Sequence, residues 1–199
     1  GEPEKGPRAR TRRLMLTSAI SLMQSGATPS VSEVAEAAGV SRATAYRYFP
    51  SEAALIHAVV DEALGPILDW TPIEGSAEDR VTDLLETSMP RIEEFEATFK
   101  AALRLSLEQW SKRQAGTLGG EPQFTRGHRV DLLLEATKPL AEKLGEQDHQ
   151  KLAQALSLIF GLEVLNVLKD IWGLSSEEAL SVARWSAHAL VSTAEREAG

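Results

Sequence analysis

The chain has 199 residues, of which 43% are hydrophobic and 25% are charged, a composition typical of globular domains with a core of their own. No run of about 18 apolar residues predicts a membrane span, and no secretory signal pattern opens the chain. Cysteine is absent, which excludes disulfides and thiolate metal sites and favours a reducing cytoplasm as the setting.

The charges are unevenly distributed along the chain. The net charge is −8, yet the stretch from Lys5 to Ser51 holds seven basic and two acidic residues, a net charge of +5. A basic end on an otherwise acidic body indicates a local surface for a polyanion.

Apolar residues recur with the helical period over the first part of the chain. Leu16, Ala19, Ile20 and Met23 follow the i, i+3, i+4, i+7 spacing and predict an amphipathic helix over about 10–24. Further helices are expected over 31–38, 42–48 and 52–64. Gly65-Pro66 and the loop DWTPIEGSAED then predict a boundary between a first domain at 1–64 and a second at 65–199.

The second part of the chain also follows the helical period. Helices are expected over 78–89, where Pro90 breaks or kinks the pattern, and over 92–112, 125–144, 148–172 and 176–197. Composition predicts a loop at 114–123. Because no alternating strand pattern occurs, the predicted fold class is all-α, with about nine helices.

The stretch VSEVAEAAGVSRATAYRYFPS, residues 31–51, places two short helical patterns back to back. Ser30 followed by Glu33 is a capping box that begins the first helix. Gly39 suits the left-handed backbone that ends it, and Ser41 caps the next helix at once. Two short helices joined by a tight glycine turn predict a helix-turn-helix, in which the second helix enters the DNA major groove.

The second helix of this motif has an apolar side and a polar side. Ala45 and Phe49, four residues apart, are expected to pack inward. The outward side carries arginine, threonine and tyrosine, which can bond phosphates or base edges. A helical hairpin with a merely charged face is the alternative interpretation.

The segment AEAAGVSRATAYRYFPSEAAL resembles the DNA-binding segment of the TetR family of transcriptional regulators. Members commonly read A-x-x-A-G-V-S-x-x-T-x-Y-x-x-F-x-s-K-x-x-L. The positions that match are Ala35, Ala38, Gly39, Val40, Ser41, Thr44, Tyr46, Phe49, Ser51 and Leu55. The resemblance covers about the first 60 residues and implies a dimer that binds operator DNA and responds to a small-molecule effector.

Carried over position by position, the resemblance implies DNA contacts from both helices of the motif. These positions are Ser30, Ser32, Arg42, Ala43, Thr44, Tyr46, Arg47 and Tyr48. Where the family usually has a lysine that contacts phosphate, this chain has Glu52, which puts that contact in doubt. The tail RARTRR, with Arg8, Arg10, Arg12 and Arg13, is either an arm for phosphates and the minor groove or a solvated tail.

The last two predicted helices are apolar over more than one face, which favours burial against a second subunit. The resemblance implies the same location for a dimer interface. The residues chosen are Leu156, Phe160, Val164, Val167, Leu180, Trp185 and Leu190. Deep burial within a monomer is the alternative.

The resemblance also implies an effector cavity within the helical body. The chosen lining residues are Phe95, Phe99, Leu103, Trp110, Phe124, His128 and Phe160, although aromatic residues at helical spacing are more often ordinary core. Arg104, Glu163 and Asn166 could supply polar groups. The sequence does not identify the effector.

Little in the sequence supports catalysis. The histidines His57, His128, His149 and His188 lie far apart and match no metal-binding helix motif, and no phosphate loop or nucleophile elbow occurs. We therefore expect no metal, no cofactor and no enzyme, but a one-component repressor that binds palindromic operator DNA as a homodimer. A ligand-independent DNA-binding protein or an activator is the alternative, and an all-α enzyme is a more remote one.

Overall fold

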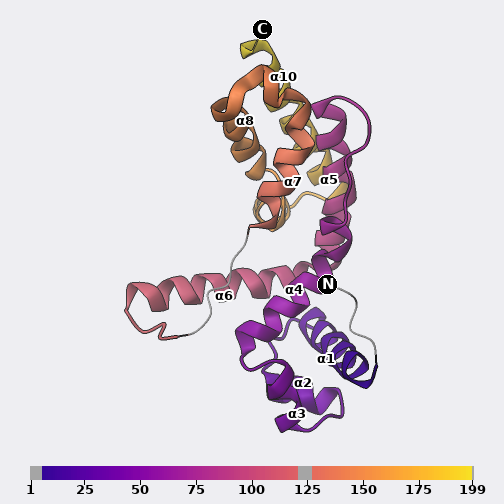
Figure 1. The fold of residues 1–199 in the computed structure, drawn as a ribbon, viewed down its shortest axis with the longest axis vertical. Coiled ribbons are helices and arrows are strands. Elements are labelled where there is room, and N and C mark those ends of the chain that lie inside the picture. Colours follow the sequence, from indigo (N-terminus) through magenta and orange to yellow (C-terminus); the bar gives the residue numbers. More distant parts are fainter. Residues whose placement is uncertain (1–5, 121–126, 199) are drawn as a thin grey trace. The chain divides into compact units, whose positions relative to one another are not determined.

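The structure, a computed structural model, describes residues 6–120 and 127–198, and within these ranges it is helical with no strand. The all-α prediction is therefore confirmed. The helices, in the order of Figure 1, are α1 Pro7–Gln24, α2 Val31–Ala37, α3 Arg42–Tyr48, α4 Glu52–Leu68, α5 Ala77–Glu94, α6 Glu96–Gln114, α7 His128–Thr137, α8 Ala141–Ser157, α9 Leu162–Leu165 and α10 Ser176–Glu197. A 3₁₀ turn, η1, covers Lys138–Leu140, and a π-helical segment, η2, covers Asn166–Ile171.

The chain divides into two compact units. The first comprises residues 1–63 and 95–125, and the second comprises residues 64–94 and 126–199. In the first unit α2 packs on α1 and α3, and α6 packs on α1. The first change of unit falls between residues 63 and 64, and α6 groups with α1–α4 because it contacts α1. The assignment of functional domains to 1–64 and 65–199 stays a prediction.

In the second unit α10 packs against α5 and α8, and α7 packs against α5 and α8. The buried side of α10 carries small residues, at most 2% exposed, spaced by four: Ala179, Ala183, Ala187 and Val191. Small side chains at this spacing bring two helix axes close together over several turns. The indole N–H of Trp70 donates to the Asp83 carboxylate at 2.7 Å and fixes the start of the α4–α5 connection on α5.

Neither Gly65-Pro66 nor Pro90 ends a helix, so the helix end expected at residue 64 is wrong, and so is a break, as opposed to a kink, at Pro90. α4 runs through Gly65 and Pro66 to Leu68, and α5 runs through Pro90 to Glu94. Gly65 has no Cβ to clash with the following proline ring, so the helical conformation is open to it. Around Pro90, the buried Met89 and Ile92 anchor α5 in the core, and this packing overrides the lost backbone hydrogen bond.

Glycine, by contrast, interrupts the long helices of the second unit. Gly145 has φ 73° within α8, where a helix end was expected. The single helix expected over 148–172 is wrong, because Gly161, with φ 98°, separates α8 from α9 and residues 166–171 adopt a π-helix. Such a φ is open to glycine and strained for other residues.

No single helix in the described ranges is long and apolar enough to cross a membrane. The segments His128–Ser157 and Leu162–Ile171 meet the length and composition test only as a pair bent by 46°, a test that core helices also meet.

Candidate nucleic-acid interface

The predicted capping box at the start of α2 is present. The Ser30 hydroxyl accepts from the Glu33 backbone N–H at 3.2 Å, and the Glu33 carboxylate accepts from the Ser30 backbone N–H at 2.7 Å. The hydrogen bonds from the Ser30 backbone, and then from its hydroxyl, lower the pKa of Glu33 below its ordinary value. The carboxylate that begins α2 is therefore held in its charged form.

The turn between α2 and α3 has the predicted geometry. Gly39 has φ 66°, and the backbone N–H of Val40 donates to the Ala35 carbonyl at 2.9 Å. Ser41 then caps α3, because its hydroxyl accepts from the Thr44 backbone N–H at 3.1 Å and donates to the Thr44 hydroxyl at 2.9 Å. The glycine therefore reverses the chain, and the serine restarts a helix two residues later.

α3 is divided into a buried and an open side as expected. Ala45 is 0% and Phe49 2% exposed, whereas Tyr46 is 47% exposed. The open side comprises Arg42, Ala43, Tyr46 and Arg47, while Thr44 and Tyr48 are half-buried. Arg42, Tyr46 and Arg47 therefore lie on the solvent side of the motif, whereas Thr44 and Tyr48 are only partly accessible.

One contact brings candidate residues of α2 and α3 together. The hydroxyl oxygens of Ser32 and Tyr46 lie 3.5 Å apart although the residues are 14 positions apart in sequence. Ser30 and Thr44, in contrast, use their hydroxyls in the helix caps. Among these hydroxyls, those of Ser32 and Tyr46 are thus not engaged in a helix cap.

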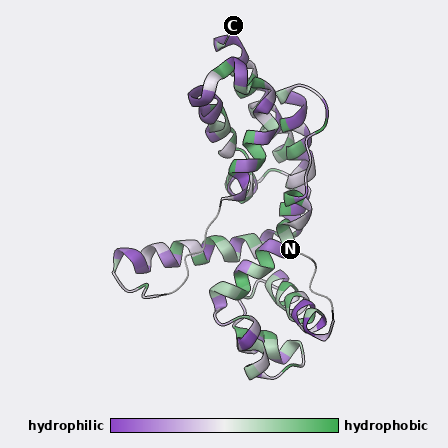
Figure 2. Cartoon of the chain, in the orientation of Figure 1, coloured by the Kyte–Doolittle hydropathy of each residue, from purple (hydrophilic) through white to green (hydrophobic). Residues whose placement is uncertain are grey.

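The arginines of the predicted tail belong to α1. The expected helix start at about residue 10 is wrong, because α1 begins at Pro7, a residue favoured in the first helical turn, which was the available signal. Its first turn carries no acidic residue. Figure 2 shows this end of α1 as hydrophilic. Basic side chains at the positive end of a helix dipole cost about 0.3–1 kcal/mol each, a cost that a bound anion would relieve.

Arg12 links this basic end to α3. Its guanidinium lies 5.7 Å from the centroid of the Phe49 ring, and the guanidinium of Arg47 lies 5.9 Å from the Tyr48 ring. A guanidinium within about 6 Å of a ring centroid makes a cation–π contact. The amino-terminal arginines and the end of α3 are therefore parts of one basic surface.

Glu52, the departure from the family pattern, lies in the first turn of α4, which Ser51 caps through the Ala54 backbone N–H at 3.1 Å. The charge of Glu52 acts on Arg104 of α6. The pKa of Arg104 is raised first by the hydrogen bond and charge of Glu108, and further by the charge of Glu52. Glu52 thus interacts with a cation of its own chain.

The residues predicted to line an effector pocket divide between the two units. In the first unit Phe95 and Phe99 are each 9% exposed, Leu103 is half-buried and Trp110 is 56% exposed. In the second unit His128 is exposed and Phe160 is buried, while Phe124 lies outside the described residues. The pocket lining stays a prediction.

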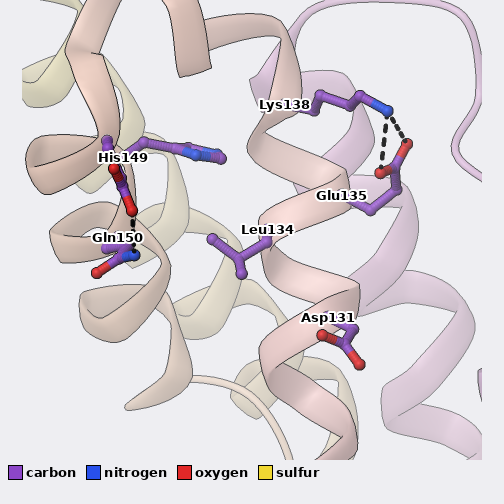
Figure 3. A pocket seen from close by; sticks show the side chains of 7 residues that line it. Asp131, Leu134, Glu135, Lys138, His149 and Gln150 are labelled. Atoms are coloured by element: carbon purple, nitrogen blue, oxygen red, sulfur yellow. Dashed lines mark hydrogen bonds and ion pairs between the residues drawn. The ribbon is translucent and has the colours of Figure 1, made fainter.

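The described residues form a different hollow, between α7 and α8 (Figure 3). Its lining is Asp131, Leu134, Glu135, Lys138, Glu146, His149 and Gln150. The buried Thr137 hydroxyl donates to the Leu133 carbonyl at 2.7 Å and lies 2.9 Å from Nε2 of His149. Among the described residues, no three histidine or acidic side chains are placed to hold a metal ion.

The predicted interface residues also differ in exposure. Leu156, Phe160 and Val164 are at most 5% exposed and belong to the core of their own unit. Leu180 and Leu190 are half-buried. Val167 and Trp185 are 46% and 72% exposed. The large apolar residues exposed in this part of the unit, several of which the periodicity did not select, are Leu158, Val167, Ile171, Trp172, Val182 and Trp185.

Comparisons with known proteins agree with this geometry. Residues 16–59 match the family described as bacterial regulatory proteins, tetR family. The HTH-type transcriptional repressor LfrR of Mycolicibacterium smegmatis is 39% identical over 56 residues, which cover 28% of this chain and 30% of that repressor. The match therefore spans less than a third of that relative.

Solved structures match over most of the chain. A TetR transcriptional regulator from Rhodococcus sp. RHA1 has a TM-score of 0.63 at 23% identity, covering 94% of this chain and 97% of that one. A tetR-family transcriptional regulator from Streptomyces coelicolor has a TM-score of 0.66 at 19% identity, covering 94% and 83%. At this identity the likeness concerns the fold. The amino-terminal segment of the chain therefore matches the TetR family of bacterial regulatory proteins, and the chain as a whole shares the fold of solved TetR regulators.

Proposed function

We propose that the chain is a one-component transcriptional repressor of the cytoplasm, which binds a near-palindromic operator as a homodimer and is released by a small-molecule effector. The observation that carries this proposal is the open polar side of α3, with Tyr46 47% exposed beside Ser32 and with Ala45 and Phe49 buried behind it. A helix anchored on one side and polar on the other is suited to enter a major groove.

The contact proposed for each side chain of the interface follows from its chemistry. Arg42 and Arg47 carry guanidinium groups that can bond two acceptors on a guanine edge or clamp a phosphate. Tyr46 and Ser32 supply hydroxyls to phosphate or base atoms, and Ala43 leaves room for the duplex or contacts a thymine methyl. Ser30, Thr44 and Tyr48 complete the proposed contact surface.

The basic end of α1 is proposed to follow the phosphate backbone. Arg8, Arg10 and Arg13 are exposed on the first turns of that helix, and Arg12 is fixed against Phe49. Contacts with phosphates position a protein on DNA and release counterions, so they give affinity that depends on salt. Glu52 is proposed to contribute no phosphate contact, since a carboxylate repels phosphate.

The proposed dimer uses the exposed large apolar residues of the second unit at positions 158, 167, 171, 172, 182 and 185. We propose that they form one face, because a contiguous apolar patch of this kind is unusual for a free surface and indicates a partner. In a two-fold dimer the same patch serves both subunits. The two copies of α3 would then reach successive major grooves about 34 Å apart, which a palindromic operator matches.

Release by an effector would follow from linkage. An effector that binds better to a dimer with the wrong α3 spacing must weaken operator binding, and operator must weaken effector binding by the same factor. A coupling of about 3 kcal/mol corresponds to roughly a hundredfold change in affinity. The predicted lining residues in α6, α7 and the α8–α9 turn are the candidates for the effector site.

Selection of bound duplexes from a random pool at fixed salt tests the proposal. We expect an enriched near-palindrome, and we expect Arg47→Gln to weaken binding by about 1–3 kcal/mol and to relax base preference at one position of each half-site. Tyr46→Phe should weaken binding without unfolding the motif, because the ring is retained. Arg113→Gln, exposed at the end of α6, is the matched control.

The outcomes distinguish the proposal from its alternatives. An enriched sequence without two-fold symmetry would contradict the dimer, and an unchanged affinity of Arg47→Gln would contradict the assignment of α3. A palindrome whose affinity no small molecule alters would favour a ligand-independent DNA-binding protein. The position of the operator relative to a promoter decides between repressor and activator.

A further inference from the structure

Three of the most exposed apolar side chains of the second unit lie outside its long helices. Leu158, which follows α8, is 77% exposed, and Ile171 and Trp172, at the end of the π-helical segment η2, are 76% and 72% exposed. The helix α9 between them has four residues, and η2 has six. Helical segments this short are not stable on their own. The orientation of these three side chains therefore depends on contacts made by the rest of the second unit.

Arg129, the second residue of α7, holds the backbone around Leu158. One guanidinium nitrogen, Nη1, donates to the carbonyls of Ser157 at 3.3 Å and Phe160 at 3.0 Å. The other, Nη2, donates to the Glu163 carboxylate in α9 at 2.7 Å. Leu158 lies between the two bonded carbonyls, so its backbone is fixed from both sides.

The Arg129 guanidinium also packs closely on the turn between α8 and α9. A Cβ at Gly161 would lie 2.9 Å from Nη2, so the guanidinium fills the space that a side chain would need. The Arg129 side chain is only 23% exposed. Water screens a partly buried ion pair less than an exposed one, which makes this contact stronger than an ordinary surface pair.

Glu93, near the end of α5, holds the backbone around Ile171 and Trp172. Its Oε1 accepts from the Lys169 ammonium in η2 and from the hydroxyl of Ser176, the first residue of α10. These hydrogen bonds, that of Lys169 first, lower the pKa of Glu93, so the carboxylate is charged at neutral pH. Ile171 and Trp172 lie between the two donors in the chain, and one carboxylate therefore fixes both ends of the stretch that exposes them.

We infer that Arg129 and Glu93 are positioning residues of the proposed dimer interface, which fix the three exposed apolar side chains in the orientation that a second copy contacts. The inference rests on the proposed function for the dimer itself. Side chains that are held in place before association lose less freedom when the partner binds, so the same apolar area gives a tighter complex. Neither charged residue has to touch the partner.

The dimer dissociation constant of the full chain, measured by sedimentation equilibrium without DNA, tests the inference. Arg129→Gln and Glu93→Gln should each raise it about tenfold, because each variant loses hydrogen bonds that involve a charged group. The matched control is Lys138→Gln, which loses an exposed ion pair with Glu135 in the same unit. This control should stay within about twofold of the wild type.

Two milder variants report on the same contacts if either substitution prevents folding, which circular dichroism detects. Ser176→Ala removes one of the two hydrogen bonds to Glu93 and leaves intact the capping box of α10, which Ser175 and Glu178 form. Arg129→Lys keeps the charge but cannot reproduce the forked donation of a guanidinium. Each should raise the dissociation constant about threefold.

Double-mutant cycles separate positioning from a general loss of stability. The cycles pair Glu93→Gln with Trp172→Ala and Arg129→Gln with Leu158→Ala. Once the apolar side chain is absent, the charged residue has nothing to position, so its substitution should change the dissociation constant by no more than about twofold. Glu93→Gln paired with Trp185→Ala is the control cycle, because Trp185 lies on the regular helix α10, and its two effects should add in free energy.

The outcomes are distinct for the inference and for the proposed dimer. Wild-type dissociation constants in both substituted proteins would overturn the inference and leave the dimer in place. So would losses that simply add to those of Trp172→Ala and Leu158→Ala, since a residue that only stabilises the fold gives that result. A wild type that stays monomeric at every concentration would contradict the proposed dimer, and the inference with it.

Discussion

Gly39→Ala tests the left-handed turn on which the placement of α3 depends. Gly39 has φ 66°, and a Cβ built there meets no atom within 4 Å, so the substitution adds backbone strain without a steric clash. An L-residue in this conformation destabilises the folded state by roughly 1–2 kcal/mol. Alanine also lowers the conformational entropy of the unfolded chain, which offsets about 0.4–1 kcal/mol of that loss. The expected net loss in the free energy of unfolding is about 1 kcal/mol.

Urea denaturation and thermal unfolding, both followed by circular dichroism, measure this loss. We expect a midpoint lower by about 2–4 °C for a chain of this length. Gly39→Asn should lose less, because asparagine tolerates the left-handed region better than alanine. Gly120→Ala, at a glycine with an ordinary φ and open space for a Cβ, is the matched control and should be neutral or slightly stabilising.

The order of the variants decides the outcome. If Gly39→Ala is as stable as the wild type, or if Gly39→Asn is the less stable of the two, the turn is not held in the left-handed conformation. Operator titration of the same variants at a temperature well below unfolding then separates a loss of stability from a displaced α3.

Three further predictions follow from the basic surface, the apolar face and the helix caps. Arg8→Gln with Arg10→Gln should flatten the dependence of log affinity on log salt by about one per lost phosphate contact, and an unaltered slope would show that α1 does not touch DNA. Trp185→Glu should weaken the dimer by at least about 2 kcal/mol in sedimentation equilibrium, whereas Leu107→Glu, exposed on α6, should not. The pKa of Glu33 is lowered in the folded state, so the charged carboxylate stabilises the fold above the ordinary glutamate pKa, and this stabilisation is lost as pH falls. Glu33→Gln should therefore flatten the dependence of the free energy of unfolding on pH between about pH 5 and pH 3. A variant with the same pH dependence as the wild type would contradict this.

Local chemistry made the DNA-binding motif predictable from the sequence. The bounds of α3, the capping box of Ser30 and Glu33 and the turn at Gly39 depend on residues at most four positions apart, so their signals survive without tertiary information. The same holds for α10, whose start carries a second capping box formed by Ser175 and Glu178. The division of α3 into a buried Ala45 and an open Tyr46 was also predicted, because the helical period fixes which side chains share a face.

The contacts that hold the second unit together could not be predicted in this way. Arg129 is 28 to 34 positions from its partners, and Glu93 is 76 and 83 positions from Lys169 and Ser176. Nothing in the local sequence distinguishes these charged residues from those of a solvated helix face. Pro66 and Pro90 show the converse, since a strong local signal for a break was overridden where the flanking side chains pack in a core.

The sequence by itself determined that this protein is helical, where its amino-terminal helices are capped, and which side of the short helix at 42–48 carries polar groups. Tertiary structure decided that α6 groups with α1–α4, and that Leu156 is buried while Leu158 is 77% exposed. The reason is that periodicity orients a side chain relative to its own helix axis. Which faces become buried depends on neighbouring helices that are distant in sequence, and on glycine turns that rotate one segment against the next.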